Sequence, residues 1–132
     1  MNSKCFCWPV RVYYEDTDTG GVVYYANYLK FFERARTEWL RNFGLNQDKL
    51  ALEEGLIFVV RRALLDFVRP ARLDDMLEVT VEPLKLAHVY VDLAQEARRG
   101  AQVLARAEVR VACLNRQNFK PVAMPRSLKD VL

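Results

Sequence analysis

Two aspartates stand one residue apart near the N-terminus, within the stretch YYEDTDTGGVVYYANY at residues 13–28. No lysine or arginine falls between Glu15 and Lys30, and Gly20 and Gly21 follow the second aspartate closely. A carboxylate can act as a base or as a nucleophile. Glycines let backbone N–H groups approach a substrate because they have no Cβ. These residue types at this spacing suit chemistry at a carbonyl carbon.

A long amphipathic helix is predicted directly after this stretch. From Tyr28 to Phe43, apolar residues recur every three or four positions and charged residues occupy much of the other side. Asn27 is the predicted N-cap, and Gly44 is predicted to end the helix. A helix N-terminus presents unpaired N–H groups and a partial positive charge. Such donors can stabilise an oxyanion while Asp16 or Asp18 acts from the opposite side.

The rest of the chain predicts a sheet for this helix to cover. Residues 10–15 alternate as a first strand, and short links between the later strands indicate antiparallel neighbours. Further strands are predicted at 57–68, 77–82, 89–94 and 103–113, a short second helix at 47–54 and a helical turn from Ser127. The predicted fold class is α+β, a five-stranded antiparallel sheet around one long helix, in a single domain over residues 1–132.

Composition and charge exclude several classes of protein. The chain is 52% hydrophobic and 28% charged with a net charge of +3, which does not indicate a nucleic-acid-binding protein. Three cysteines and one histidine do not form a metal-site pattern, so free thiols are expected, with Cys113 buried in a strand. The first residues contain no long apolar segment and no small-residue cleavage site. We therefore predict no signal peptide and a cytoplasmic location.

The stretch RVYYEDTDTGGVVYYANYLKFFERARTEWLR resembles the signature of the YbgC-type acyl-CoA thioesterases, which are relatives of 4-hydroxybenzoyl-CoA thioesterase. The resemblance continues through FVVRRALLDFVRPARLDDMLEV and, more weakly, to AEVRVACLN and the tail. It implies the hotdog fold and hydrolysis of an acyl-CoA thioester without a metal or redox cofactor. Genes of this family often accompany the Tol–Pal system of the cell envelope.

Site residues follow from the same resemblance. The family's catalytic carboxylate falls on Asp18, and its oxyanion donor falls on the backbone N–H of Tyr25. Many YbgC-type proteins have histidine at the position of Tyr25, so a main-chain role is expected here rather than a side-chain one. The expected substrate-binding residues are Gly20, Gly21, Val22, Tyr24, Tyr28 and Arg61.

Other readings of these residues remain open from the sequence. Asp18 is also suited to an Asx turn, and Asp16 to a structural role in the loop. Glu33 and Glu38 are rival carboxylates on the helix, although neighbouring arginines favour a solvated charged face; these are Arg34, Arg36 and Arg41. Four arginines are candidates for contacts to the phosphates of coenzyme A, namely Arg61, Arg62, Arg69 and Arg72.

The predicted partners are an acyl-CoA substrate and a second copy of the chain. Residues 57–68 are more apolar than one face of an edge strand requires, which favours a dimer or a tetramer. An acyl-carrier protein is the alternative carrier, and association with the inner face of the membrane is a further prediction. Two other functions stay open: a hydroxyacyl dehydratase, for which His88 is the only histidine, and a non-catalytic binder of acyl thioesters or acyl-carrier protein.

Overall fold

The computed structural model describes residues 5–129 as one sheet with a long helix lying across it. The elements run in the order β1 (Phe6–Arg11), η1 (Tyr14–Asp16), α1 (Asn27–Arg41), α2 (Gln47–Lys49), η2 (Leu50–Glu54), β2 (Leu56–Phe67), β3 (Met76–Leu86), β4 (Tyr90–Arg99), β5 (Gln102–Asn115) and η3 (Arg126–Leu128).

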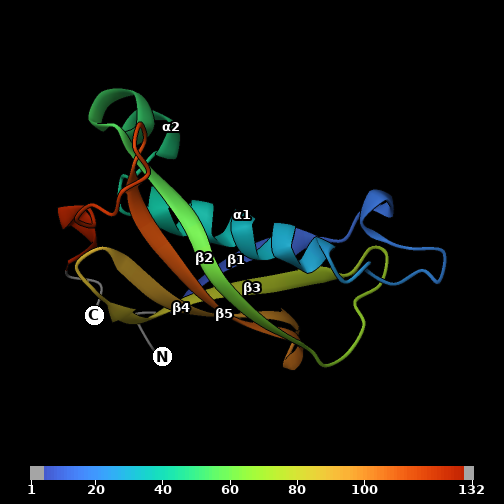
Figure 1. Ribbon diagram of the computed structural model, residues 1–132. Coiled ribbons are helices and arrows are strands. Elements are labelled where there is room, and N and C mark those ends of the chain that lie inside the picture. Colours follow the sequence, from blue (N-terminus) through green and yellow to red (C-terminus); the bar gives the residue numbers. More distant parts are fainter. Residues whose placement is uncertain (1–4, 130–132) are drawn as a thin grey trace.

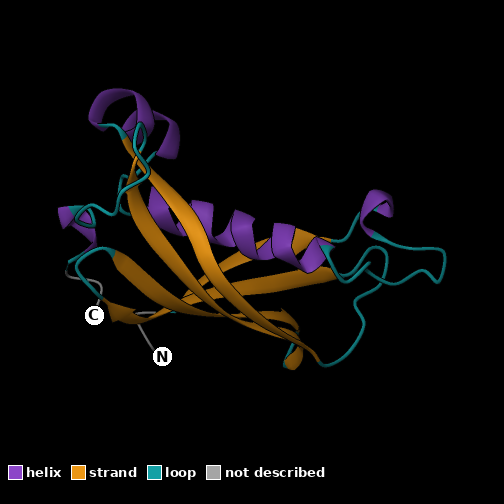
Figure 2. Cartoon of the chain, in the orientation of Figure 1, coloured by secondary structure: helices purple, strands orange, loops and turns teal. Residues whose placement is uncertain are grey.

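The five strands form one antiparallel sheet in the order β1-β3-β4-β5-β2. The sheet curves around α1, which lies along its concave side, as Figure 1 and Figure 2 show. This arrangement confirms the predicted five-stranded sheet around one long helix. The strands β1 and β2 form the two edges of the sheet, and β2 is therefore free to pair on one side.

Burial of one face of α1 holds the helix on the sheet. Six side chains of α1 are buried: Tyr28, Phe31, Phe32, Ala35, Trp39 and Leu40. The helix has no side-chain cap at its N-terminus, because its N-cap residue is Ala26. A good cap contributes about 1 kcal/mol, whereas burying one large apolar side chain contributes about 1.5–3 kcal/mol. Packing against the sheet therefore decides where this helix lies.

Two local predictions near the start of the chain are wrong. The first strand ends at Arg11 rather than at Glu15, and Tyr14 is 83% exposed at the start of a 3₁₀ turn. The reason is that the buried Asp16 carboxylate accepts the Tyr13 N–H at 2.8 Å and turns the chain there. Asn27 is the first helical residue and not the N-cap.

The later predictions hold within a few residues. Gly44 adopts a left-handed conformation (φ 76°) just after the end of α1, as a helix-ending glycine does. The second helical segment covers residues 47–54, and a short turn contains Ser127. No helix among residues 5–129 is both long enough and apolar enough to cross a membrane.

The strand β2 contains an irregularity at Arg61. Val60 pairs with Val111 and Arg62 pairs with Arg110, so Arg61 is an extra residue without a partner on β5. A bulge of this kind changes which side chains face each side of the sheet. Val60 therefore faces the helix side, like the partly buried Phe58 before it, and Ala63 takes up that side after the bulge.

The thiols provide a test of this packing. Cys113 is buried, and burial raises the pKa of its thiol to about 11, whereas Cys7 is exposed. Because only the thiolate reacts, a raised pKa leaves Cys113 protonated at pH 8. We expect Cys7 of the native protein to react with a disulfide reagent at pH 8 while Cys113 reacts only after unfolding in guanidinium. Rapid reaction of Cys113 in the native protein would contradict the burial of β5.

Candidate active site

A loop at one end of the sheet carries the predicted site. It runs from the end of β1 to the start of α1, beside the loop between β2 and β3 (Figure 1). Val22 pairs with Arg72, and the Val23 N–H donates to the Ala71 carbonyl at 2.8 Å. These contacts fasten the two loops together, although they lie about 50 positions apart in the sequence.

Asp16 organises the interior of this loop. Its side chain is 3% exposed and accepts from the Tyr13 N–H. Its backbone carbonyl accepts from the Tyr24 N–H at 3.0 Å and from the Asn27 side chain at 2.9 Å. Asp16 is therefore a structural residue, as predicted, and the side chain of Asn27 holds the loop rather than capping the helix.

Asp18 is exposed on the same loop. Its Oδ1 accepts from the Gly20 N–H at 2.8 Å, which is the predicted Asx turn, and its N–H donates to the Val22 carbonyl at 2.9 Å. No hydrogen bond within residues 5–129 involves its other carboxylate oxygen. The turn thus orients the carboxylate and leaves one oxygen available to a substrate or a water molecule.

Positions 20 and 21 favour glycine for different physical reasons. Gly21 adopts φ 76°, a conformation that other residues reach only with strain. A Cβ on Gly20 would stand 3.2 Å from Oδ1 of Asp18 and would press on the carboxylate. Both glycines therefore support the loop conformation that presents Asp18.

Tyr25 lies just before α1 in the chain. Within the described part of the chain, the N–H groups of Tyr25 and Ala26 donate no hydrogen bond, whereas those of Tyr24 and Asn27 do. Unpaired N–H groups ahead of a helix are suited to binding a negative charge. The backbone N–H of Tyr25 is therefore available for the role that the resemblance assigns to it.

Aromatic side chains line a groove beside Tyr25. The rings of Tyr25 and Tyr28 stand 5.9 and 5.6 Å from that of Phe67, and Tyr24 stands 4.9 Å from Tyr25. The Tyr28 hydroxyl accepts from the Ala71 N–H at 3.1 Å. Burial raises the pKa of Tyr28, although that hydrogen bond opposes the shift. The groove measures about 270 Å³ and is lined by Val23, Tyr25, Tyr28, Phe67, Val68, Arg69 and Pro70.

Sequence reasoning did not identify the far wall of this groove. Phe67 and Val68 follow Tyr28 by about 40 positions, and only the pairing of the two loops brings them to Tyr25. The predicted substrate-binding residue Arg61 lies elsewhere, at the exposed bulge of β2. Arg69, which follows Phe67 by two positions, lines the groove, whereas Arg61 does not.

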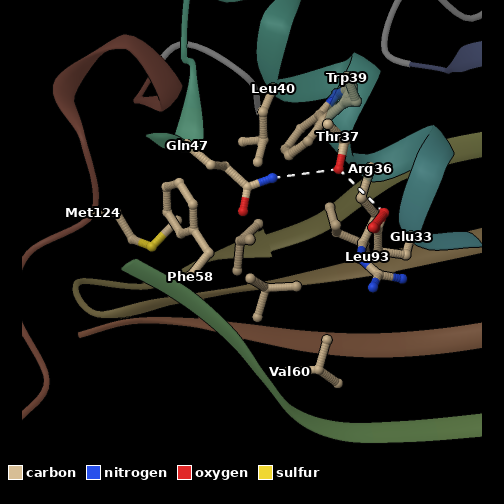
Figure 3. Close-up of a pocket in the computed structure, with 12 residues that line it drawn as sticks. Glu33, Arg36, Thr37, Trp39, Leu40, Gln47, Phe58, Val60, Leu93 and Met124 are labelled. Atoms are coloured by element: carbon tan, nitrogen blue, oxygen red, sulfur yellow. Dashed lines mark hydrogen bonds between the residues drawn. The ribbon is translucent and has the colours of Figure 1, made fainter. Parts of the chain in front are cut away.

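A second cavity lies under the C-terminal half of α1 (Figure 3). It measures about 130 Å³ and is lined by Glu33, Arg36, Thr37, Trp39, Leu40, Gln47, Phe58, Val60, Val91, Leu93, Val111 and Met124. Along one side, Gln47 donates to the Thr37 hydroxyl at 3.3 Å and that hydroxyl donates to Glu33 at 3.4 Å (Figure 3). The cavity is therefore apolar with a hydrogen-bonded polar side.

Arg36 does not belong to a solvated charged face, and that prediction is wrong. Its guanidinium donates to Gln95 at 3.0 Å, and the Gln95 side chain donates to the carbonyls of Phe32 and Thr80. Burial lowers the pKa of Arg36, and the nearby Glu33 opposes that shift. By contrast Glu38 pairs with Arg41 at 2.6 Å on the outer side of the helix, as expected.

The geometry of one five-stranded antiparallel sheet wrapped around a long helix defines a hotdog-fold protein. The family model described as the thioesterase-like superfamily matches residues 12–132. The chain belongs to this superfamily, and the resemblance recognised in its sequence is confirmed.

Named relatives and solved structures that resemble this chain include thioesterases. The chain is 47% identical to the acyl-CoA thioesterase YbgC of Haemophilus influenzae, over 98% of this chain and 95% of that protein. It is 40% identical to a probable thioesterase from Bartonella henselae, with a TM-score of 0.87 over 92% of this chain and 99% of that structure. A 1,4-dihydroxy-2-naphthoyl-CoA thioesterase from Synechocystis shares 26% identity with a TM-score of 0.88, covering 96% of this chain and 94% of its own.

The hydrogen bond between Tyr28 and Ala71 predicts a specific loss of stability. Tyr28→Phe keeps the ring contacts but leaves the Ala71 N–H without its acceptor. Leaving a buried donor unsatisfied costs about 1–3 kcal/mol. We expect the free energy of unfolding in urea to fall by that amount. The control Tyr24→Phe, at a half-exposed ring, should change it by less than about 0.5 kcal/mol. Equal stabilities of the two variants would contradict the proposed fastening of the loops.

Proposed function

We propose that this protein hydrolyses acyl-CoA thioesters to a free acid and a thiol. The main observation behind this proposal is the exposed carboxylate of Asp18 on the loop that leads to Tyr25. The Tyr25 N–H is unpaired and lies beside an apolar groove. Relatives named as acyl-CoA thioesterases, at up to 47% identity, support the same chemistry. A purely non-catalytic binding role is not favoured, because the curated relatives are named as hydrolytic enzymes.

In the proposed mechanism, the thioester carbonyl oxygen accepts the N–H of Tyr25, and charge developing on that oxygen is stabilised at the start of α1. Asp18 then acts in one of two ways. As a nucleophile it attacks the carbonyl carbon, expels the thiolate and forms a mixed anhydride that water hydrolyses. As a general base it takes a proton from a water molecule that attacks the same carbon. In both routes the C–S bond breaks, and water supplies the oxygen of the acid and the proton of the thiol.

A hydroxyacyl dehydratase receives no support from the geometry. His88 lies in the exposed turn between β3 and β4, and its carbonyl accepts from the Met124 N–H near the C-terminus. That chemistry needs an imidazole beside the carboxylate. The Asp18 loop instead adjoins the turn between β2 and β3, which is at the other end of β3.

We also propose that the active site is completed by a second copy of the chain. β2 is an edge strand, and its helix-side residues Val60 and Phe67 are about half exposed. Two copies joined antiparallel through β2 would extend one sheet and leave both helices on the same face. The helices then run in opposite directions, so the start of one α1 adjoins the C-terminal half of the other.

In this dimer, the cavity under α1 of one copy would serve the active site of the other copy. Within one chain, Arg36 lies nine residues along α1 from Asn27, which is about 14 Å at about 1.5 Å per residue. A short acyl group whose carbonyl oxygen accepts the Tyr25 N–H cannot span that distance. Across the dimer the same cavity adjoins the partner's site, and we propose that it receives the acyl group of the thioester bound there.

The cytoplasmic location, the single-domain organisation, acyl-carrier protein as a carrier and association with the inner face of the membrane stay predictions from the sequence. So does the choice between dimer and tetramer.

Asp18→Asn tests the proposed carboxylate. Asparagine retains the oxygen that accepts from Gly20, so the loop should fold. Loss of the base or nucleophile should lower kcat at least ~100-fold on the best of a panel of short, long and aromatic acyl-CoA substrates. Release of free thiol gives the rate.

Two variants serve as controls for that experiment. Tyr25→Phe keeps the backbone N–H and the ring, so it should retain most of the activity. Asp16→Asn should lose less activity than Asp18→Asn, and its loss should come with lower stability. If Asp18→Asn stayed within a few-fold of the wild type while Asp16→Asn or Glu38→Gln abolished turnover, Asp18 would not be the catalytic carboxylate.

Subunit complementation tests the composite site. Thr37→Phe places a ring in the cavity without touching the Asp18 loop, so it should be inactive like Asp18→Asn if the acyl group enters there. Co-expressing the two variants should restore activity, because half of the dimers then contain one intact site. About a quarter of the wild-type activity is expected from random pairing of two-fold dimers. No recovery on co-expression, or a monomer in light scattering, would refute the shared site.

A further inference from the structure

Among residues 5–129, Arg69 is the one charged residue that lines the groove beside Tyr25. The other lining residues are apolar or aromatic: Val23, Tyr25, Tyr28, Phe67, Val68 and Pro70. No carboxylate lines this groove, and within residues 5–129 the Arg69 side chain makes no hydrogen bond or ion pair. The groove thus carries a positive charge that the surrounding residues do not balance.

The four arginines of β4 and β5 are balanced by nearby acids. Arg110 pairs with Asp92 at 2.8 Å, and Arg99 pairs with Asp75 at 2.7 Å. The arginines Arg98 and Arg106 both contact Glu96. Arg69 differs from these four because it makes no such pair, and it differs from Arg61 and Arg62 on β2 because it lines the groove.

The backbone on both sides of Arg69 is held firmly. The N–H groups of Val68 and Arg69 both donate to the Leu104 carbonyl, at 2.8 and 3.0 Å. Pro70 follows, which restricts the conformation of the residue before it. Ala71 is bound in turn to Tyr28 and Val23. Arg69 is therefore presented from a rigid turn, which lowers the entropic cost of using its guanidinium for binding.

The two sides of a thioester, the acyl group and the carrier arm, leave its carbonyl carbon in different directions. If the acyl group enters the partner's cavity, the carrier arm must leave on the other side of the carbonyl, along the groove of the chain that provides Tyr25. The arm of coenzyme A has an apolar and amide portion and ends in phosphate. An apolar groove with an unpaired guanidinium in its lining is complementary to that arm, since arginine binds phosphate oxygens with two parallel hydrogen bonds.

We propose that Arg69 binds the phosphate end of the pantetheine arm of the substrate's carrier. This inference rests on the proposed thioesterase function and separates Arg69 from Arg61 and Arg62, two of the other arginines that the sequence offered. Arg62 lies opposite Arg110 in the register of β2 and β5, on the side of the sheet away from α1. Arg61 lies at the bulge. Coenzyme A and a phosphopantetheinylated carrier protein both have a phosphate at this end of the arm, so the site is compatible with either carrier.

The test compares Arg69→Gln with wild type on one acyl group carried by coenzyme A, by 4′-phosphopantetheine and by pantetheine without phosphate. We expect KM for the acyl-CoA to rise about tenfold with kcat within twofold, a change between that of an exposed ion pair and that of a buried charged hydrogen bond. KM for acyl-pantetheine should not change. Arg69→Lys should recover part of the loss, and Arg62→Gln is the matched control that should behave like wild type.

The three carriers separate the sources of the phosphate. An effect on both acyl-CoA and acyl-phosphopantetheine assigns Arg69 to the phosphate next to pantetheine, which a carrier protein also has. An effect on acyl-CoA alone would place Arg69 at the phosphates of the nucleotide and would contradict the proposed contact with the phosphate of the arm. An equal rise in KM for acyl-pantetheine, or no rise on any substrate, would overturn the proposal.

Measuring the binding of coenzyme A directly distinguishes a failure of this proposal from a failure of the proposed function. Calorimetry with coenzyme A itself should show a Kd about tenfold higher for Arg69→Gln than for wild type, and that difference should shrink as salt is added because the contact is ionic and exposed. If the wild type hydrolysed no thioester yet Arg69→Gln weakened coenzyme A binding, the function would fail and the binding site would stand. If turnover were normal and coenzyme A binding unchanged, the binding site would fail alone.

Discussion

Packing of α1 along the concave side of the sheet is the constraint on which the other features of this protein depend. Its buried face includes Phe31 and Phe32, which are almost completely inaccessible to solvent. The helix is held by that face and has no side-chain cap, and within residues 5–129 the N–H groups of Tyr25 and Ala26 just ahead of it donate no hydrogen bond. The same packing points this start at the loop that carries Asp18.

The loop at the helix start is stable because buried polar groups are satisfied from two directions. Asp16 binds the loop from within, and Tyr28 binds the turn after β2 through the Ala71 N–H. Neither residue needs to touch the substrate to matter, since together they fix the positions of Asp18 and Tyr25. Two aspartates one residue apart therefore have different surroundings: Asp16 is buried and hydrogen-bonded within the loop, and Asp18 is exposed with one carboxylate oxygen available.

The bulge at Arg61 gives β2 two different halves. Before it, Phe58 and Val60 line the cavity under α1, and after it Phe67 reaches the groove at the helix start. One extra residue therefore lets a single edge strand contribute to both hollows, which lie at opposite ends of α1. A second chain pairing on this edge would bring the cavity of one copy to the groove of the other, so the edge is also the element through which the two hollows would be combined.

The sequence alone determined the order and type of the main elements. The helix from Tyr28 onward and the alternation of β5 are local patterns, because the side chains that define them recur with the period of a helix or of a strand. It also identified Asp18 and the helix start as neighbours, since only a few residues separate them in the chain. The exact bounds of β1 and the role of Asn27 were missed, because hydrogen bonds to Asp16 overrode the local preferences there.

Tertiary structure decided everything that joins distant segments. Phe67 and Arg69 belong to the groove only because the turn after β2 is bound to the Tyr28 hydroxyl and to Val23. Arg36 has the pattern of a surface charge in the sequence, yet the packing of α1 on the sheet brings Gln95 to it and leaves it only partly exposed. The continuous apolar run of β2 could not reveal its two faces, because a bulge shifts the alternation by one residue and is set by pairing with β5. Such contacts depend on how the strands pair and curve, and no local pattern of residue types encodes that geometry.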